Sequence, residues 1–200
     1  REVFSKYDIM TVSEGAGSSP EDAIQFVDPD RKELDMAYHF ESVDIGNHVK
    51  DFGLAKYKQI FSRYDETFKE KGWLSIFLAN HDQPRMVSKF GNDTAEFREL
   101  SSKMLSTFVM TMRGTPYYYY GDELGMVNIR FNDINDYNDV ETRNKYTQIK
   151  NAGGDLDAYM ENRKQTSREN GRTPFQWDTT ENAGFTTGKP WLKVNSNHNI

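Results

Sequence analysis

Short strand-like segments alternate with helical segments over the first 127 residues, and this alternation is what most constrains the fold. Four segments have the apolar, β-branched or aromatic character of strands: Asp8–Ser13, Asp35–Phe40, Trp73–Ala79 and Pro116–Tyr120. Helical crossovers between consecutive strands require parallel pairing, because an antiparallel hairpin needs only a short turn. The order therefore predicts an α/β fold with a parallel sheet.

The segments between these strands carry helix signals. Leu54–Lys71 repeats apolar side chains at three- and four-residue steps and is followed by Gly72. Residues 97–112 repeat the pattern and end before Gly114. A shorter helix is predicted after Ser18 and Ser19, where a hydroxyl cap precedes a proline and two acidic residues.

The pattern changes near residue 128. The remaining residues are rich in Asn, Asp and Thr, with short helical stretches near Thr142–Lys150 and Asp155–Lys164 and a loop-like tail. We therefore predict that residues 1–127 form the α/β part and that residues 128–200 are a helical and irregular excursion of the same domain. The chain starts at Arg1 without a signal-peptide pattern, and we expect both ends to be cuts through a longer protein.

Composition excludes several functional classes. A formal charge of −6 argues against a protein that binds a phosphate backbone, which needs a basic face. The chain has no cysteine, so disulfides, thiolate metal sites and cysteine nucleophiles are excluded. It has no apolar run of about 18 residues that would span a membrane. An aromatic content of 14% provides enough ring surface for a folded core.

Polar side chains follow three of the four predicted strands. Glu14 follows the first, Asn80-His81-Asp82 the third and Asp122-Glu123 the fourth. The carboxyl ends of parallel strands form the ligand face of such folds. Carboxylates gathered in one cleft cannot all stay ionised, so one becomes a proton donor while another stabilises a cation. That pair of roles is what cleavage of a glycosidic bond requires.

Other interpretations remain open at this level. A single acid after a strand is most often a turn or helix cap. His39 together with His81-Asp82 suggests a two-metal hydrolase, but no further ligands occur at useful spacing. The Gly15–Gly17 stretch lacks the third glycine of a dinucleotide-binding loop. The tyrosine run at 117–120 is expected to be a buried strand rather than a stacking platform.

Longer motifs resemble glycoside hydrolase family 13, the α-amylase family, and within it the oligo-1,6-glucosidase and α-glucosidase subgroup. Residues 11–14 (TVSE) resemble the third conserved region of that family, and residues 80–85 (NHDQPR) with 87–91 (VSKFG) resemble the fourth. Residues 116–126 (PYYYYGDELGM), 167–178 (SRENGRTPFQWD) and 184–191 (GFTTGKPW) add to the likeness, which covers the whole chain in the family's order.

The resemblance implies the second half, about four strands, of a (β/α)₈ TIM barrel that hydrolyses α-glucosidic bonds with retention. It implies that Glu14 is the acid/base, that Asp82 stabilises the transition state, and that His81 and Arg168 bind the sugar in the −1 subsite. Arg85 is expected to contact the substrate near the entrance. The family's nucleophile belongs to a region upstream of Glu14, so we expect this chain alone to be inactive.

The remaining expectations follow from the same resemblance. Sucrose isomerases of the subgroup carry an arginine-rich loop, whereas Ile45–Gly53 contains no arginine, which favours hydrolysis. The alternative is a non-catalytic, glucosidase-like partner of a membrane transporter. We expect an oligosaccharide substrate, no metal or other cofactor, no nucleic acid or membrane partner, and a cytoplasmic location. Exposed barrel edges are expected to let the fragment self-associate.

Overall fold

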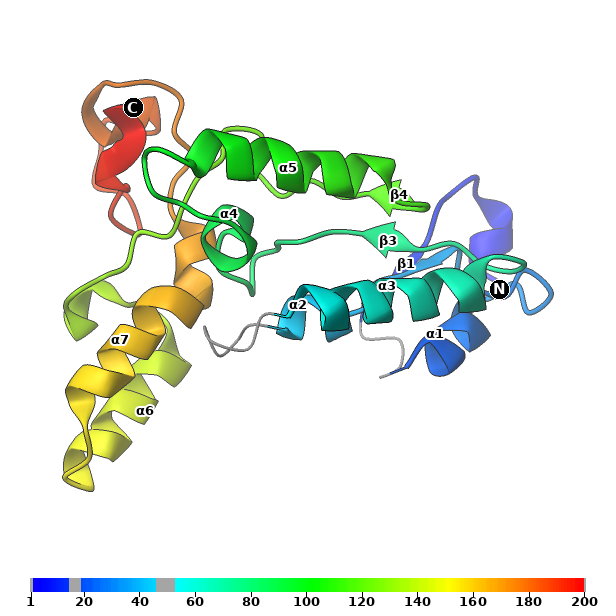
Figure 1. The fold of residues 1–200 in the computed structure, drawn as a ribbon, viewed down its shortest axis with the longest axis horizontal. Coiled ribbons are helices and arrows are strands. Elements are labelled where there is room, and N and C mark those ends of the chain that lie inside the picture. The colour runs from blue at the N-terminus through cyan, green and yellow to red at the C-terminus, as the bar shows by residue number, and fades with distance from the viewer. Residues whose placement is uncertain (1, 15–18, 46–52, 200) are drawn as a thin grey trace. The chain divides into compact units, whose positions relative to one another are not determined.

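The computed structural model describes residues 2–14, 19–45 and 53–199 (Figure 1). The chain divides into two compact units. The first consists of Arg1–Leu78 and Thr107–Tyr117, and the second of Ala79–Ser106 and Tyr118–Ile200. None of the helices within the described ranges has the length and apolar character needed to cross a membrane.

The first unit contains the four strands β1 (Val12–Ser13), β2 (Met36–Ala37), β3 (Ser75–Ile76) and β4 (Thr115–Pro116). β1 pairs with β2 and β3 pairs with β4, both in parallel, and a parallel bridge between Ala37 and Leu74 joins the two pairs. The predicted α/β class with parallel strands is therefore confirmed.

Each strand is shorter than predicted, and the tyrosine run was assigned wrongly. β4 ends at Pro116, so Tyr117–Tyr120 continue as half-buried irregular chain rather than as a buried strand. Residues 8–10, predicted as strand, are exposed and lie ahead of β1. Apolar character predicts burial, but a strand also needs a neighbouring strand whose backbone N–H and C=O groups can pair with its own.

Three helices of the first unit begin and end close to the predicted positions. They are α1 (Pro20–Val27), α3 (Leu54–Phe68) and α5 (Arg98–Thr111), which runs from the second unit into the first. The unit also contains η1 (Phe4–Lys6), which was not predicted, and α2 (Glu41–Asp44). The Ser19 hydroxyl caps α1 by accepting the Asp22 N–H at 3.1 Å. Gly72, which follows α3, has a φ of +81°, a left-handed conformation that favours glycine. The short α2 was not predicted.

His39 belongs to the core of the first unit. Its ring is 2% exposed and stacks on Tyr64 at 4.1 Å, with Phe61 at its edge. Burial lowers the pKa of His39 to about 4, so the imidazole is neutral at pH 7. The structure thus gives His39 a packing role, and the two-metal interpretation gains no support from it.

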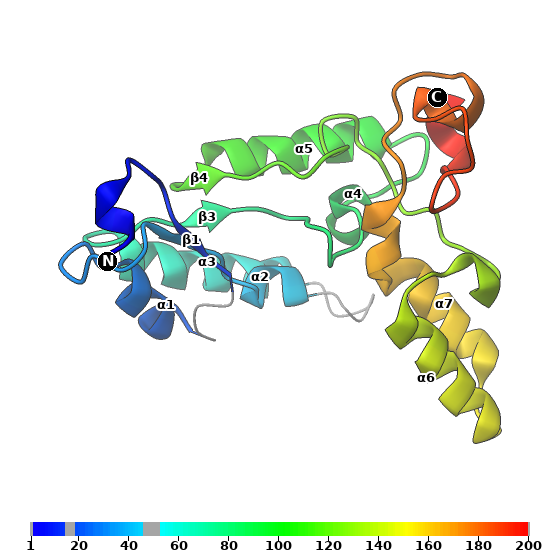
Figure 2. The ribbon, with the colours of Figure 1, turned by 180° about the vertical axis from the view of Figure 1, so that it is seen from behind.

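The second unit is helical and irregular. It contains α4 (Met86–Phe90), α6 (Val140–Asn151) and α7 (Leu156–Thr166), together with the short 3-10 helices η2 (Ile134–Asp136), η3 (Arg168–Arg172), η4 (Glu181–Gly184) and η5 (Ser196–Asn199). α6 and α7 lie side by side in both views (Figures 1 and 2) and agree with the two predicted helical stretches. α4 was not predicted. The boundary at residue 127 was predicted to separate an α/β part from a helical and irregular part of one domain. This boundary stays a prediction.

Candidate active site

The carboxyl ends of the four strands carry an acid and three aromatic rings. Glu14 directly follows β1 and is exposed, and Tyr38, Phe77 and Tyr117 directly follow β2, β3 and β4. The Tyr38 ring contacts those of Phe77 and Tyr117 at 5.1 and 5.0 Å. Burial raises the pKa of Tyr38, and Tyr117 and the Glu14 charge raise it further. Glu14 is therefore exposed at the carboxyl end of β1, which is the position that the sequence predicts, and aromatic rings follow the other three strands.

His81 and Asp82 lie in a tight turn of the second unit. The Asp82 N–H donates to Asn80 Oδ1 at 2.8 Å and the Gln83 N–H donates to the Asn80 carbonyl at 3.2 Å. Both functional side chains reach solvent, with 60% of the His81 side chain and 43% of the Asp82 side chain exposed, and their Nε2 and Oδ2 atoms are 3.2 Å apart. The turn thus offers an imidazole and a carboxylate to the same surface.

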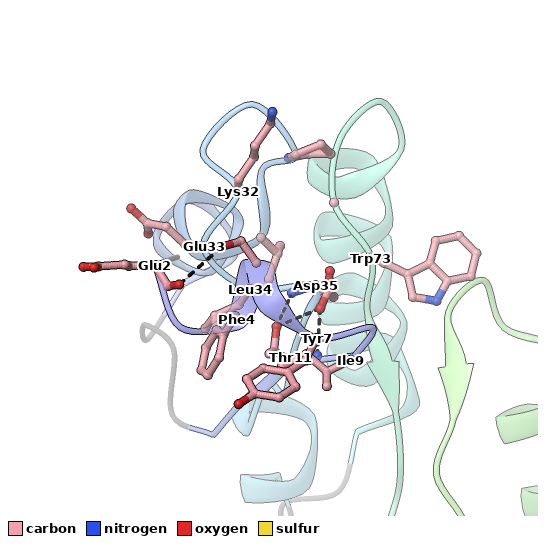
Figure 3. A pocket seen from close by; sticks show the side chains of 14 residues that line it. Glu2, Phe4, Tyr7, Ile9, Thr11, Lys32, Glu33, Leu34, Asp35 and Trp73 are labelled. Atoms are coloured by element: carbon pink, nitrogen blue, oxygen red, sulfur yellow. Dashed lines mark hydrogen bonds between the residues drawn. The ribbon is translucent and has the colours of Figure 1, made fainter.

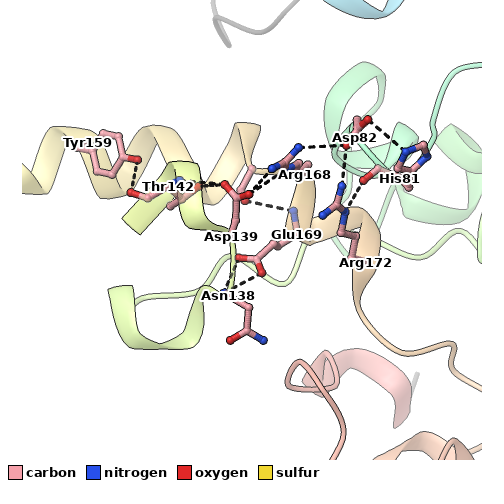
Figure 4. A network of polar contacts seen from close by, with 10 residues as sticks. His81, Asp82, Asn138, Asp139, Thr142, Tyr159, Arg168, Glu169 and Arg172 are labelled. Atoms are coloured by element: carbon pink, nitrogen blue, oxygen red, sulfur yellow. Dashed lines mark hydrogen bonds and ion pairs between the residues drawn. The ribbon is translucent and has the colours of Figure 1, made fainter. Parts of the chain in front are cut away.

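Two arginines of η3 surround the Asp82 carboxylate (Figure 4). Arg172 Nη2 lies 2.6 Å and Arg168 Nη1 3.4 Å from Asp82 Oδ1. They are the first and last residues of η3, and both guanidinium groups reach the same carboxylate oxygen. The structure therefore brings His81, Asp82 and Arg168 together. Glu14 belongs to the other unit, so its meeting with Asp82 in one cleft remains a prediction.

Asp139 anchors Arg168 from the start of α6. Its Oδ1 accepts Arg168 Nε at 2.9 Å and Nη2 at 2.5 Å, while its Oδ2 accepts the Thr142 N–H and hydroxyl at the first turn of the helix. Burial works to raise the pKa of Asp139, but the hydrogen bonds from Thr142 and Arg168 outweigh it and the net shift is downward. The hydrogen bond to Asp139 in turn raises the pKa of Arg168. Arg168 is thus held as a cation.

The expected contact of Arg85 with a substrate does not agree with its position. The side chain is fully buried. Its guanidinium donates to the carbonyls of Tyr120 at 2.5 Å, Asn170 at 3.2 Å and Thr173 at 3.5 Å. The ring of Tyr120 lies 4.8 Å below it. Because its donors are directed at carbonyls inside the unit, Arg85 holds the segments around the site instead of binding a sugar.

Asp122 is buried beside Arg85 without full hydrogen bonding. Its Oδ2 accepts the Tyr119 N–H at 3.2 Å, and its Oδ1 has no hydrogen-bond partner among the residues that the structure describes. Burial raises the pKa of Asp122 to about 7, although the Arg85 charge opposes the shift. A carboxyl that is protonated in the folded state at mildly acidic pH makes folding depend on pH.

We expect the second unit to lose stability as the pH rises from 5 to 8. In the folded chain Asp122 keeps its proton up to about pH 7, whereas in the unfolded chain it loses the proton near pH 4. The contribution of this carboxyl to the free energy of unfolding is therefore fully present below pH 4 and is lost as the pH rises through 7. Its full size is roughly 4 kcal/mol at most. Asp122→Asn should flatten the slope in urea unfolding at pH 5, 6.5 and 8. Asp157→Asn, an exposed control, should leave it unchanged, and equal slopes for wild type and Asp122→Asn would contradict the assignment.

A pocket of about 790 Å³ lies at the amino ends of β1, β2 and β3 (Figure 3). Phe4, Tyr7, Ile9, Leu34 and Trp73 provide most of its apolar lining. Thr11 and Asp35 also line it, and the Thr11 N–H and hydroxyl both donate to Asp35 Oδ2 at 2.7 Å. Catalytic groups of parallel α/β folds stand at the carboxyl ends of strands, so this pocket is not the candidate active site.

Sequence reasoning missed Arg172 and Asp139. Arg172 stands inside the 167–178 motif, and Asp139 precedes a predicted helix, where an aspartate indicates a cap. The motif was therefore a usable signal for Arg172, whereas the second role of Asp139, holding Arg168, left no trace in the sequence.

Comparison with known proteins identifies the family. A family model described as the catalytic domain of alpha amylase matches residues 1–200. The chain belongs to the α-amylase family. The chain is 46% identical over 205 residues to the oligo-1,6-glucosidase of Parageobacillus thermoglucosidasius and 45% identical over 206 residues to the trehalose-6-phosphate hydrolase of Bacillus subtilis. The predicted family resemblance is confirmed.

Solved structures agree with this assignment. The isomaltulose synthase from Erwinia rhapontici NX5 has a TM-score of 0.92 and 42% identity, and the match covers 99% of this chain and 37% of that one. The trehalose-6-phosphate hydrolase of Bacillus licheniformis also has a TM-score of 0.92, with 44% identity. The two curated relatives are each matched over 36% of their length. The chain is therefore part of an α-amylase-type TIM-barrel domain.

Proposed function

We propose that the chain is the second half of the (β/α)₈ barrel of a retaining α-glucosidase that acts on short oligosaccharides. The observation that carries the proposal is the half-exposed Asp82 carboxylate between the guanidinium groups of Arg168 and Arg172, in the motif where the family places its transition-state stabiliser. The exposed Glu14 at the carboxyl end of β1 supports it independently.

In the proposed reaction Glu14 is the general acid/base. As the carboxylic acid it gives its proton to the glycosidic oxygen while the bond from that oxygen to C1 breaks and C1 forms a bond to the family's nucleophilic aspartate. As the carboxylate it then takes a proton from the water that displaces this aspartate from C1. Asp82 opposes the positive charge that develops on the oxocarbenium-like sugar. His81 and Arg168 donate hydrogen bonds to sugar hydroxyls. The nucleophilic aspartate belongs to the part of the family's barrel that the chain does not match.

Hydrolysis is proposed over isomerisation. Relatives of both kinds occur, since the similar solved structures include isomaltulose synthases and a trehalose-6-phosphate hydrolase. The segment Ile45–Gly53 contains no arginine, and its residues 46–52 lie outside those that the structure describes. Within this proposal the helical excursion 128–200 belongs to the same catalytic domain, and the enzyme is cytoplasmic.

A non-catalytic partner of a membrane transporter is the alternative in this family. Loss of catalytic groups would favour it, whereas Glu14, His81, Asp82 and Arg168 are all present and at least three of them are gathered at one surface. The retained groups favour an enzyme.

A chimera tests the proposal. Residues 1–200 replace the matched segment of the Parageobacillus thermoglucosidasius oligo-1,6-glucosidase, and the chimera is assayed on isomaltose, maltose, sucrose and trehalose 6-phosphate. We expect release of glucose from at least one substrate, with retention at the anomeric carbon, and no turnover by the 200-residue chain alone. A folded chimera that hydrolyses none of the four while its parent is active would favour the non-catalytic alternative.

The same preparation of the chain alone tests self-association. Val3, Tyr7 and Met10 are each more than 60% exposed, and β1 pairs only with β2 within the described ranges. A strand edge without a partner is a template for a second chain, and the exposed apolar side chains that precede β1 can add contact area. Sedimentation velocity should therefore show dimers or larger species that the chimera does not form. A monomer at high concentration would contradict this part of the proposal.

A further inference from the structure

Arg172 reaches the catalytic turn with two separate donors (Figure 4). Its Nε donates to the His81 carbonyl oxygen at 2.6 Å, and its Nη2 donates to Asp82 Oδ1 at 2.6 Å. One contact holds the backbone of the turn and the other holds the carboxylate. Because the guanidinium is planar and rigid, the two contacts together determine the direction in which Asp82 points.

Arg168 is engaged differently. Two of its nitrogens bind Asp139, and only Nη1 approaches Asp82, at the longer distance of 3.4 Å. Arg168 is therefore secured from α6 and keeps a donor that a sugar hydroxyl can take. Arg172 instead donates from Nε and Nη2 to the turn itself, so the two arginines have different roles.

The backbone around Arg172 is built for this approach. A Cβ at Gly171 would lie 2.5 Å from the Gln83 carbonyl oxygen, so only glycine lets η3 come this close to the turn. On the other side, Trp191 Nε1 donates to the Arg172 carbonyl at 2.9 Å. Arg172 is thus supported on both sides before its side chain reaches Asp82.

Stability alone does not account for the contact. The side chains of Arg172 and Asp82 are 34% and 43% exposed, and ion pairs at such exposure contribute between 0 and about 1 kcal/mol. The reaction rate is far more sensitive to the orientation of a reacting group, since a displacement of about 1 Å can lower the rate roughly 100-fold.

We propose that Arg172 is a positioning residue that holds the Asp82 carboxylate and the His81 imidazole in their working directions. The inference rests on the proposed function, because it gives Asp82 a catalytic task. Arg172 itself touches no substrate; it acts through the turn, by means of a geometry that a lysine cannot reproduce.

The test uses Arg172→Ala and Arg172→Lys in the chimera, with Arg143→Ala as an exposed arginine control. Both Arg172 variants should lower kcat by roughly 100-fold with KM changed much less, and Lys should rescue little because one ammonium cannot make both contacts. Added guanidinium should restore part of the activity of Arg172→Ala, whereas methylammonium should not. Full activity in Arg172→Lys, or a loss confined to KM, would overturn the proposal.

A second readout separates this inference from the proposed function. Crystal structures of the 200-residue chain and of its Arg172→Ala and Arg172→Lys variants should show Asp82 turned away or spread over several conformers in both variants. If Asp82 moves although the wild-type chimera hydrolyses nothing, the positioning role stands and the proposed function fails. If Asp82 keeps its place without Arg172, the positioning role fails whatever the activity.

Discussion

Replacing Glu14 by glutamine should lower kcat of the chimera by about 10²–10⁴-fold on an unactivated disaccharide. Glutamine matches the shape of the exposed side chain at the end of β1 but has no proton to give to the glycosidic oxygen. The loss should shrink for aryl glucosides with good leaving groups, because these need little protonation. Added azide should raise the turnover of such substrates in the variant, since an anionic nucleophile needs no general base.

The control for this substitution is Glu33→Gln. Glu33 also belongs to the first unit but stands ahead of β2, at the amino ends of the strands, and pairs with Arg31. We expect it to leave kcat and the pH–rate profile unchanged. If the profile of Glu14→Gln were the same as that of the parent chimera, the acid/base would have to be another residue.

Replacing Arg85 by methionine should destabilise the second unit by about 3–5 kcal/mol. Methionine fills a similar volume, but the carbonyls of Tyr120, Asn170 and Thr173 lose their shared donor inside the unit. Asp122 loses the nearby positive charge as well. Thr173 keeps the Tyr120 hydroxyl as a donor to its carbonyl at 2.9 Å, whereas the carbonyls of Tyr120 and Asn170 are left unpaired. Removing a buried charge also removes its desolvation cost, which offsets part of the loss, yet the two unpaired carbonyls each cost about 1–3 kcal/mol and outweigh it.

Urea unfolding of the chain at pH 7 measures this effect, followed by the fluorescence of Trp177 and Trp191 in a Trp73→Phe background, since Trp73 belongs to the first unit. Arg85→Lys should be intermediate, because an ammonium can reach some of the carbonyls but not all three. Arg143→Met, on the exposed face of α6, should change the free energy of unfolding by no more than about 0.5 kcal/mol. An Arg85→Met chain as stable as wild type would mean that water or other donors satisfy these carbonyls.

Local patterns were sufficient for the longer helices and for the order of the strands, but not for the short helices α2 and α4. The cap at Ser19 and the apolar repeat of α3 act between residues no more than four apart, so the sequence shows them directly. Strand lengths were overestimated because pairing depends on a partner from another part of the chain. Tyr117–Tyr120 is apolar enough for a strand, yet its residues leave the ladder after Pro116.

The motifs in the amino-acid sequence were enough to indicate the family and to single out Glu14, His81, Asp82 and Arg168. Arg85 was placed wrongly, because the family resemblance implied a position near the entrance, whereas its acceptors lie inside the unit and come from residues up to 88 positions away. Arg172 is likewise separated from Asp82 by 90 positions. Periodicity and caps record only local interactions, so the roles of such arginines follow from how distant segments pack together in the folded chain.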